Sequence, residues 1–397
     1  MIKKVDLINL FVFIVSPFFA IPSIIYGVIN KSKISLTLLI LLFGVVSFMY
    51  IPNFSDDRSR YFEIYDDFRN NSFSEVFAFF ILSSQDFILQ SLFYWASQFQ
   101  IPAQLVFALV TMFSIGAVFF IYYKILNSYE FVNKRYGLIS LLLLIFSISY
   151  LDLLSGTRFM FASSFVLLAF YLGIIEKKNW VILLLIIASF IHFSTLIFLP
   201  LFLVLKLFSN QYRIYKVIFL ASLFFIVLPK SVVMSIFELL GLGGALQQKG
   251  ESYLGGEDFI EKGISGSFGA VFIYYISLIW IFLGYGYLLI TLNRNSTIRN
   301  VVFLTASLIN VFYSTPTIFL RYAIILKFIF VFMLLIELYN YRKNLVIYFF
   351  GIVFILILGT QIIVARNNIE KSFVSAESLL MITIISKDKI TPNDFIE

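Results

Sequence analysis

The chain of 397 residues contains no cysteine and only one histidine. Without cysteine it holds neither a disulfide framework nor a thiolate nucleophile or thiolate-bound metal. A single histidine also argues against a zinc centre, because such centres draw on several His or Cys ligands. The sequence further lacks a P-loop, the HExxH and GxSxG motifs and a dinucleotide-binding fingerprint. These absences leave few of the familiar metal- and nucleotide-dependent enzyme classes, and we expect no cofactor.

The chain is instead rich in apolar residues. Hydrophobic residues make up 61% of it and aromatic residues 19%, whereas charged residues make up only 13%. A soluble protein of this size could not bury so much apolar surface, and uncharged runs of about 18 residues or more match a helix that crosses the bilayer. The sequence therefore predicts an all-α, polytopic integral membrane protein and not a barrel of alternating strands. In such a protein the net charge of +7 does not indicate nucleic-acid binding, because the position of each basic residue matters more than the sum.

About 12 apolar segments are expected to form transmembrane helices within a single domain, residues 1–397. The first is expected to be one retained helix, broken or bent near Pro17 and Pro22. Short interfacial helices are expected in the larger outer loops. The predicted segments are 5–29, 34–51, 101–123, 137–154, 159–175, 180–191, 194–208, 214–229, 268–292, 300–315, 322–340 and 345–364. The larger regions between and after them are two outer loops, at about 52–100 and 230–267, and a C-terminal tail, at about 365–397.

The distribution of lysine and arginine predicts which helix ends face the cytoplasm. One set of alternate loops holds fourteen basic residues and three acidic ones, and the opposite side holds the other acidic residues. By the positive-inside rule the basic set is cytoplasmic. This alternation requires the segments 180–191 and 194–208 to cross separately, which puts His192 at their outer tip. Both chain ends then lie outside, although Lys3 and Lys4 argue against an outer N-terminus.

Two arginines are predicted at the outer ends of helices. Arg158 ends the turn LSGTR, and Arg321 ends STPTIFLR. A guanidinium at the bilayer boundary needs water, a headgroup or an anionic partner, and it can bind a phosphate through two parallel hydrogen bonds. Two such groups facing one cavity would suit a lipid-linked diphosphate; alternatively, each side chain extends to the lipid headgroups. Lys327, further along the helix of Arg321, either lines the same cavity or pairs with an acidic residue.

An acidic and aromatic run, SDDRSRYFEIYDDF, lies near the start of the first outer loop. Its carboxylates and tyrosine rings could bind sugars or supply a general base, but the run also fits a solvated charged loop. A divalent metal ion held by Asp56 and Asp57 is a further alternative. His192, in ASFIHFSTLIF, could take a proton from a hydroxyl or donate one to a phosphate. It could equally cap a turn of helix.

Taken in order, these pieces resemble the EpsG/Wzy-like polymerases of bacterial surface polysaccharides, the O-antigen polymerase type. The resemblance begins with an outer loop that carries Asp57, Tyr61 and Tyr65 at intervals of four. Its most specific part is the block GTRFMFASSFVLLAFYLGIIEKKNWVILLLIIASFIHFSTLIFLP, where an arginine opens a helix rich in small residues and a later helix ends in Ile-His-x-Ser. An Arg-Tyr pair at 321–322 completes the pattern. The family often has Gly before its Asp, where this chain has SDD, so the choice between Asp56 and Asp57 stays open.

The resemblance implies a glycosyltransferase in the bacterial cytoplasmic membrane with its active site facing the periplasm or exterior. The enzyme would transfer a growing glycan from undecaprenyl diphosphate to a sugar hydroxyl of the next lipid-linked repeat unit, for example in lipopolysaccharide synthesis. Its partners would be this lipid-linked oligosaccharide, membrane lipid and a separate chain-length regulator. In this interpretation arginines neutralise the leaving diphosphate, without a metal. The expected site residues are His192 (first choice as base) and Asp57 (second choice) for catalysis, Arg158 and Arg321 for the diphosphate, and Arg60, Tyr61, Tyr65 and Tyr322 for the glycan.

Three alternative functions remain open. A GT-C-type glycosyltransferase with a lipid-phosphate sugar donor would centre on Asp56 and Asp57, as base or as metal ligands. A surface-polymer ligase would differ only in its acceptor. A lipid-linked oligosaccharide flippase would need charges deep within several helices, whereas Lys327 is the only basic residue well inside a predicted segment. That asymmetry favours an enzyme that works at one face of the membrane.

Overall fold

The computed structural model describes residues 4–69, 71–72, 74–76, 87–129, 134–232, 268–341, 344–387 and 389–396. Within these ranges every regular element is a helix, apart from one isolated bridge between Asn53 and Ile396. The predicted all-α, polytopic membrane class is confirmed, because five of the described helices are long and apolar enough to span a bilayer. The predicted outer loop at 230–267 lies outside the described residues from position 233 onward.

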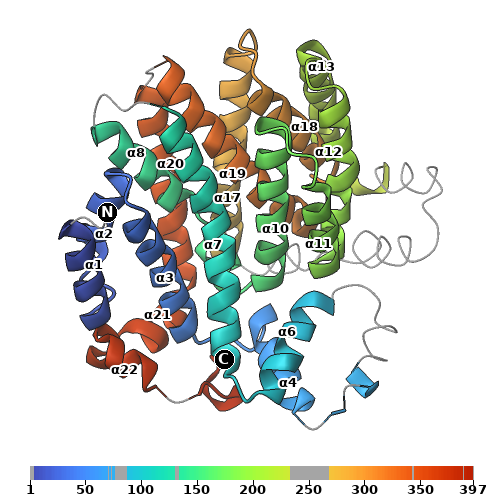
Figure 1. The fold of residues 1–397 in the computed structure, drawn as a ribbon. Helices are drawn as coiled ribbons and strands as arrows, with labels where there is room; N and C mark the ends of the chain where they lie inside the picture. The colour runs from blue at the N-terminus through green and yellow to red at the C-terminus, as the bar shows by residue number, and fades with distance from the viewer. Residues whose placement is uncertain are drawn as a thin grey trace. The chain divides into compact units, whose positions relative to one another are not determined.

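The chain divides into two compact units, which are described separately. Unit 1 comprises residues 1–171, 179–199 and 361–397, and unit 2 comprises residues 172–178 and 200–360. The expectation of a single transmembrane domain stays a prediction. The helices of unit 1 (Figure 1) are α1 (Lys4–Val15), α2 (Ile21–Ile29), α3 (Lys33–Met49), α4 (Asp57–Phe68), α6 (Phe87–Gln98), α7 (Ala103–Ser128), α8 (Lys134–Ser147), α9 (Tyr150–Leu154), α10 (Thr157–Phe170), α11 (Ile182–Ile191), the 3-10 turn η2 (Phe193–Ile197), α21 (Arg366–Phe373), η5 (Ala376–Leu379), α22 (Met381–Ile385) and η6 (Pro392–Asp394). At Tyr171 the helix of α10 continues into unit 2 as a π-helical turn, η1 (Tyr171–Ile175).

Helix α7 separates two chemically different ends of unit 1. Its 26 residues give it a length of about 39 Å. Beyond its last turn, Lys31 donates to the carbonyl of Tyr129 (3.4 Å), which joins two of the basic loops. Before its first turn, the Tyr65 hydroxyl donates to the carbonyl of Ile101 (2.7 Å), which joins the acidic run to α7. We call these the basic end and the acid-rich end of unit 1.

The N-terminal segment doubles back on itself, which corrects the prediction of one bent helix. Near the start of α1, the Ser32 hydroxyl donates to the carboxylate of Asp6 at the basic end. Just after α1, the Ser16 hydroxyl donates to the carbonyl of Leu379 (2.6 Å), in the C-terminal tail at the acid-rich end. The proline-containing turn between α1 and α2 stops the first helix and starts the second. The described chain therefore begins at the basic end and not, as predicted, at the opposite end.

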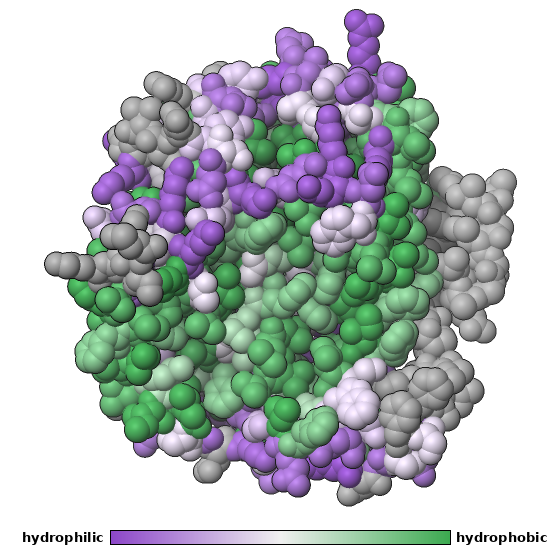
Figure 2. All heavy atoms as spheres, viewed as in Figure 1, coloured by the Kyte–Doolittle hydropathy of each residue, from purple (hydrophilic) through white to green (hydrophobic). Residues whose placement is uncertain are grey.

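Apolar side chains cover much of the described surface. On the face in view, hydrophobic residues gather over the long helices and hydrophilic residues gather near helix ends (Figure 2). Phe11 on α1 is 69% exposed, and Ile352 on α20 (Asn344–Val364) is 61% exposed. Water would penalise so large an exposed apolar area, whereas lipid tails do not. The exposure fits the multi-pass membrane class.

Unit 2 is tied together by a buried ion network. The Glu337 carboxylate accepts from Arg294 (Nη1 to Oε2, 2.7 Å), from Arg299 (Nε to Oε1) and from the Tyr287 hydroxyl. Arg299, which is 1% exposed, also donates to the carbonyl and hydroxyl of Thr291 (2.9 and 2.7 Å). The network joins three helices and the turn between two of them. The helices of unit 2 are α12 (Phe198–Leu207, from residue 200), α13 (Tyr212–Ser222), η3 (Leu223–Val227), α17 (Phe268–Ile290), α18 (Thr297–Val311), α19 (Pro316–Tyr341) and α20 up to residue 360.

Replacing Glu337 by alanine is expected to destabilise the protein strongly. The change leaves the buried guanidinium of Arg299 without its carboxylate partner, which typically costs about 3–5 kcal/mol. The measurement is the thermal unfolding midpoint of the detergent-purified protein, with Glu370→Ala at an exposed position as the control. Equal midpoints for the two variants would mean that the network does not hold unit 2 together.

Candidate active site

The acidic run forms helix α4, and the loop before it fixes the role of Asp56. The Asp56 carboxylate accepts from the backbone N–H of Asn53 (2.9 Å) and from the hydroxyl of Tyr50 (3.3 Å). It thereby closes the turn that leads into the helix. Asp57 is the first residue of α4, where the helix dipole favours a negative charge. Of the two adjacent aspartates, Asp56 is held by the loop, and Asp57 is half-buried and faces another element.

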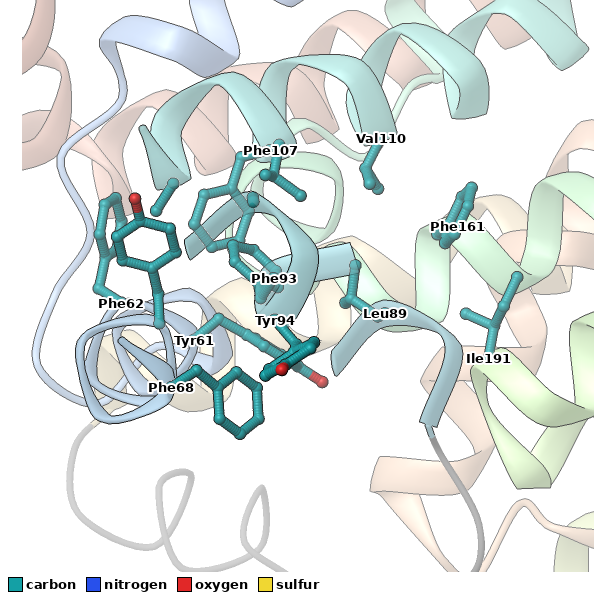
Figure 3. Packing of buried hydrophobic residues seen from close by; sticks show 14 of the residues in the cluster. Tyr61, Phe62, Phe68, Leu89, Phe93, Tyr94, Phe107, Val110, Phe161 and Ile191 are labelled. Carbon is teal, nitrogen blue, oxygen red and sulfur yellow. The ribbon is translucent and has the colours of Figure 1, made fainter. Parts of the chain in front are cut away.

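One face of α4 packs into an aromatic cluster with α6 and α7 (Figure 3). The Tyr61 ring stacks on Phe93 at 5.2 Å between centroids, and the Tyr65 hydroxyl donates to the carbonyl of Ile101, just before α7. Both tyrosines are nearly fully buried, whereas Arg60 is exposed. The structure therefore gives Tyr61 and Tyr65 packing roles, and the predicted glycan contacts of these three residues stay predictions. The labelled cluster residues are Tyr61, Phe62, Phe68, Leu89, Phe93, Tyr94, Phe107, Val110, Phe161 and Ile191.

Arg58, which the sequence analysis did not select, is the fully buried anchor of α4. Its guanidinium donates to the carbonyl and hydroxyl of Ser47 (2.5 and 3.2 Å) and to the carbonyl of Leu154 (3.3 Å). It also lies over the ring of Phe107, 4.1 Å from the centroid. Burial lowers the pKa of Arg58 to about 9, so the side chain is still charged at neutral pH. A helical projection would have revealed it, because Arg58 shares a face with Tyr61, Phe62 and Tyr65.

Asp57 and Arg158 face each other across two helices. The Arg158 Nε lies 3.8 Å from the Asp57 Oδ2, and the two side chains are 22% and 27% exposed. Arg158 is the second residue of α10, so the positive end of that helix dipole adds to its charge. A half-buried pair of this kind is less screened by solvent than a surface pair. The pair brings a carboxylate, a guanidinium and a helix N-terminus together at one point of the acid-rich end.

The turn before α10 brings Arg158 to this position. A Cβ on Gly156 would lie 3.1 Å from the Asp152 carbonyl oxygen, so a larger residue would require the backbone of this turn to shift. The same turn supplies the Leu154 carbonyl that accepts from Arg58. Two adjacent residues of α4 therefore contact this turn. Arg58 donates to the Leu154 carbonyl inside the core, and Asp57 forms the ion pair with Arg158.

His192 stands between α11 and the 3-10 turn η2. Its backbone is extended (φ −150°, ψ 109°), which ends α11. Its ring caps η2, because Nδ1 accepts from the backbone N–H of Ser194 (3.3 Å) and lies 2.8 Å from the Ser194 hydroxyl. An Nδ1 that accepts puts the ring proton of a neutral histidine on Nε2. The capping interpretation is thus present in the structure, with the ring nitrogen as acceptor, and the catalytic role stays a prediction.

The structure brings three of the predicted residues to one part of unit 1. Asp57 pairs with Arg158, and the His192 ring packs edge-on against the next residue of α10, Phe159, at 5.4 Å between centroids. The residue before the histidine, Ile191, belongs to the aromatic cluster beneath α4. The predicted segments on either side of His192 are separate helices, α11 and α12.

The remaining predicted residues lie in α19 of unit 2. Arg321 is half-buried, and the buried ring of Tyr322 packs edge-on against Phe312 at 5.5 Å. Lys327, two turns on, is also buried. Whether Arg321 and Tyr322 act with the residues of unit 1 stays a prediction.

The described residues contain no group of three or more His, Asp or Glu side chains that could hold a metal ion. Asp56 is engaged by Asn53 and Tyr50, and Asp57 faces a cation. A divalent ion at these two aspartates stays an expectation of the alternative interpretation only.

Comparison with known proteins gives one match. The model of the EpsG family matches residues 33–375, which include α3 through α21 and therefore both the Asp57–Arg158 pair and His192. No curated protein and no solved structure matches the chain.

Proposed function

Because the chain belongs to the EpsG family, whose members are polymerase-type membrane proteins of polysaccharide synthesis, we propose that it elongates a glycan on a lipid carrier. The donor is the growing glycan on undecaprenyl diphosphate, and the acceptor is a sugar hydroxyl of the next lipid-linked repeat unit. The observation that carries this proposal is the ion pair of Asp57 and Arg158 at the N-terminus of an apolar helix. It offers a proton acceptor and an anion-binding group a few ångströms apart.

The proposed reaction needs one proton acceptor and one site for negative charge. The acceptor hydroxyl attacks the anomeric carbon of the donor glycan, and its proton passes to the Asp57 carboxylate. A new glycosidic C–O bond forms as the C–O bond to the diphosphate breaks, and undecaprenyl diphosphate leaves with the bonding electrons. The guanidinium of Arg158 and the dipole of α10 stabilise the charge that grows on the leaving group.

Two observations support Asp57 over His192 as the base. Asp57 directly adjoins the proposed diphosphate-binding arginine. The His192 Nδ1 already accepts from Ser194, so in the neutral ring Nε2 carries the proton and acts as a donor. We therefore assign His192 to hydrogen bonding of a substrate oxygen. Arg321 remains our second candidate for the diphosphate.

The Asp57–Arg158 pair favours the polymerase over the lipid-phosphate alternative. A diphosphate leaving group calls for a cation beside the reacting centre, and Arg158 meets that need without a metal. The alternative requires both aspartates at the centre, yet Asp56 is engaged in the turn before α4.

The test is glycan profiling on gels in a strain that lacks the gene. Loss of a polymerase leaves single repeat units on the acceptor, whereas loss of a flippase leaves none. Complementation with Arg158→Ala is expected to reduce elongation by about 10²–10³-fold, the usual cost of one charge-stabilising donor. Arg158→Lys should recover part of the lost elongation, because lysine restores the positive charge but not the two parallel hydrogen bonds of a guanidinium. The control is Arg213→Ala, an exposed position on α13, which should give full-length polymer. Full-length polymer from Arg158→Ala would remove this residue from the mechanism.

A further inference from the structure

Two parts of the C-terminal segment, residues 365–387 and 389–396, pack against the loop that leads into α4, and we propose that they position Asp57 for transfer. We call these two parts together the C-terminal strap and residues 50–56 the entry loop. The inference rests on the proposed function, because it concerns the residue assigned there as the base. From the sequence alone, the same segment is only a C-terminal tail.

The first part of the strap binds the backbone of the entry loop on both sides of one residue. On α21, Asn368 donates to the carbonyl of Ile51 (3.0 Å), and Ser372 accepts from the N–H of Ile51 (2.9 Å). The Asn53 side chain also donates to the Asn368 side chain (3.4 Å). Asn368 and Ser372 are four residues apart, so they share one face of α21, and both are almost fully buried. A polar face of a short helix thus binds both backbone groups of a single residue, Ile51.

The last part of the strap pairs with the next residues of the entry loop. Ile396 accepts from the N–H of Phe54 (3.0 Å) and donates to the carbonyl of Pro52 (3.1 Å), which forms the bridge opposite Asn53. The Phe395 ring packs against Phe54 (5.4 Å) and against Phe62 of α4 (5.6 Å). The matched family region ends at residue 375, so these contacts come from residues beyond it.

The held loop determines where Asp57 lies. The strap fixes Ile51, Pro52 and Phe54 from outside, and the Asp56 carboxylate fixes the same loop from inside. Helix α4 begins at Asp57, directly after this loop, so the position of the loop sets the position of the Asp57 carboxylate. A shift of about 1 Å in a reacting group can slow a reaction about 100-fold. A loosened loop should therefore slow transfer even when Asp57 and Arg158 are intact.

The chain contains no cysteine, so two introduced cysteines form one defined disulfide. Asn53→Cys with Ile396→Cys joins the two bridged positions, whose spacing in a strand bridge falls within the range of a disulfide. We expect this pair to cross-link in membranes treated with a mild oxidant. Absence of the cross-link would contradict the packing of the strap itself.

The activity test adds Asn368→Ala, with the neighbouring exposed residue Asn367→Ala as the matched control. Purified variants that show equal unfolding midpoints are compared in transfer assays with a lipid-diphosphate oligosaccharide. Asn368→Ala is expected to lower kcat by at least tenfold while KM changes little, and Asn367→Ala is expected to match the wild type. Equal rates for the two variants would overturn the proposal.

Redox rescue separates positioning from general damage. Asn368→Ala in the double-cysteine background should be slow when reduced, and oxidation should restore the rate of the oxidised double-cysteine protein. A cross-linked triple variant that stays slow would also overturn the proposal. Asp57→Asn with the activity of the wild type would instead contradict the proposed function. The yield of the cross-link does not depend on that result, so the two failures can be told apart.

Discussion

Asp57→Asn is expected to abolish polymer and leave single repeat units, with the rate of glycan transfer reduced by about 10²–10⁴-fold. An amide has nearly the size of the carboxylate but takes no proton at neutral pH, and it forms no ion pair with Arg158. The side chain is 27% exposed, so the fold should survive the change. The measurement is the transfer rate of the purified variant, checked against an unfolding midpoint equal to that of the wild type.

Two other aspartates make the result specific. Asp66→Asn changes an exposed carboxylate on the same helix and is expected to leave polymer length unchanged. In Asp56→Asn, the amide oxygen can still accept from Asn53 and Tyr50, so most activity should remain. Equal loss from Asp56→Asn and Asp57→Asn would favour the lipid-phosphate glycosyltransferase, in which both carboxylates act together.

Arg58→Met is expected to lower the free energy of unfolding by about 2–4 kcal/mol and to remove activity with it. The variant removes the guanidinium hydrogen bonds to the carbonyls of Ser47 and Leu154. These carbonyls keep only the longer contacts from the Tyr50 N–H and the Thr157 hydroxyl, both 3.4 Å. Each lost bond costs about 1–3 kcal/mol, and the apolar side chain offsets part of this cost. The variant also releases α4 from the turn that presents Arg158. Thermal unfolding and transfer rate are measured together, with Arg213→Met at an exposed position of α13 as the control.

The pH dependence of the Arg58 contribution has a defined sign. Burial lowers the pKa of Arg58 to about 9 in the folded state, below its value in the unfolded chain. Below pH 9 the cost of the buried charge is constant, and as pH rises through 9 the folded state can lose that charge and gain stability. From pH 6 to 8 the difference in unfolding midpoint between Arg58→Met and wild type should therefore stay constant. A difference that changes steadily over that range would contradict a charged, buried Arg58.

Much of the helical framework followed from apolar runs, because a segment in lipid must satisfy its own backbone hydrogen bonds. The runs at 101–123 and 322–340 match α7 and α19 closely. The N-terminal segment was mispredicted, because its length of 25 residues suits one span, and only tertiary contacts such as Ser16 with Leu379 reveal the reversal. The helical character of 57–68 was also missed, since its charges hide the apolar face that carries Tyr61, Phe62 and Tyr65.

The candidate site was predictable residue by residue but not pair by pair. Arg158 and Asp57 were each selected by position and residue type, yet about a hundred residues separate them, and no local pattern joins them. Arg58 and Asn368 were not selected, because their roles depend on carbonyls and side chains of distant segments, such as Leu154 and Ile51. Long-range polar contacts of this kind leave no periodic signal in a single sequence.

The central claim is that Asp57 and Arg158 act as one unit in transfer, and a double-mutant cycle tests it most directly. Transfer of glycan between purified lipid-diphosphate repeat units is measured for the wild type, Asp57→Asn, Arg158→Gln and the double variant. When two groups act as one unit, removing either one already removes their joint contribution to the rate. The double variant should therefore be no more than a few-fold slower than the slower single variant. Losses that multiply in full, or a single variant as fast as the wild type, would contradict the account.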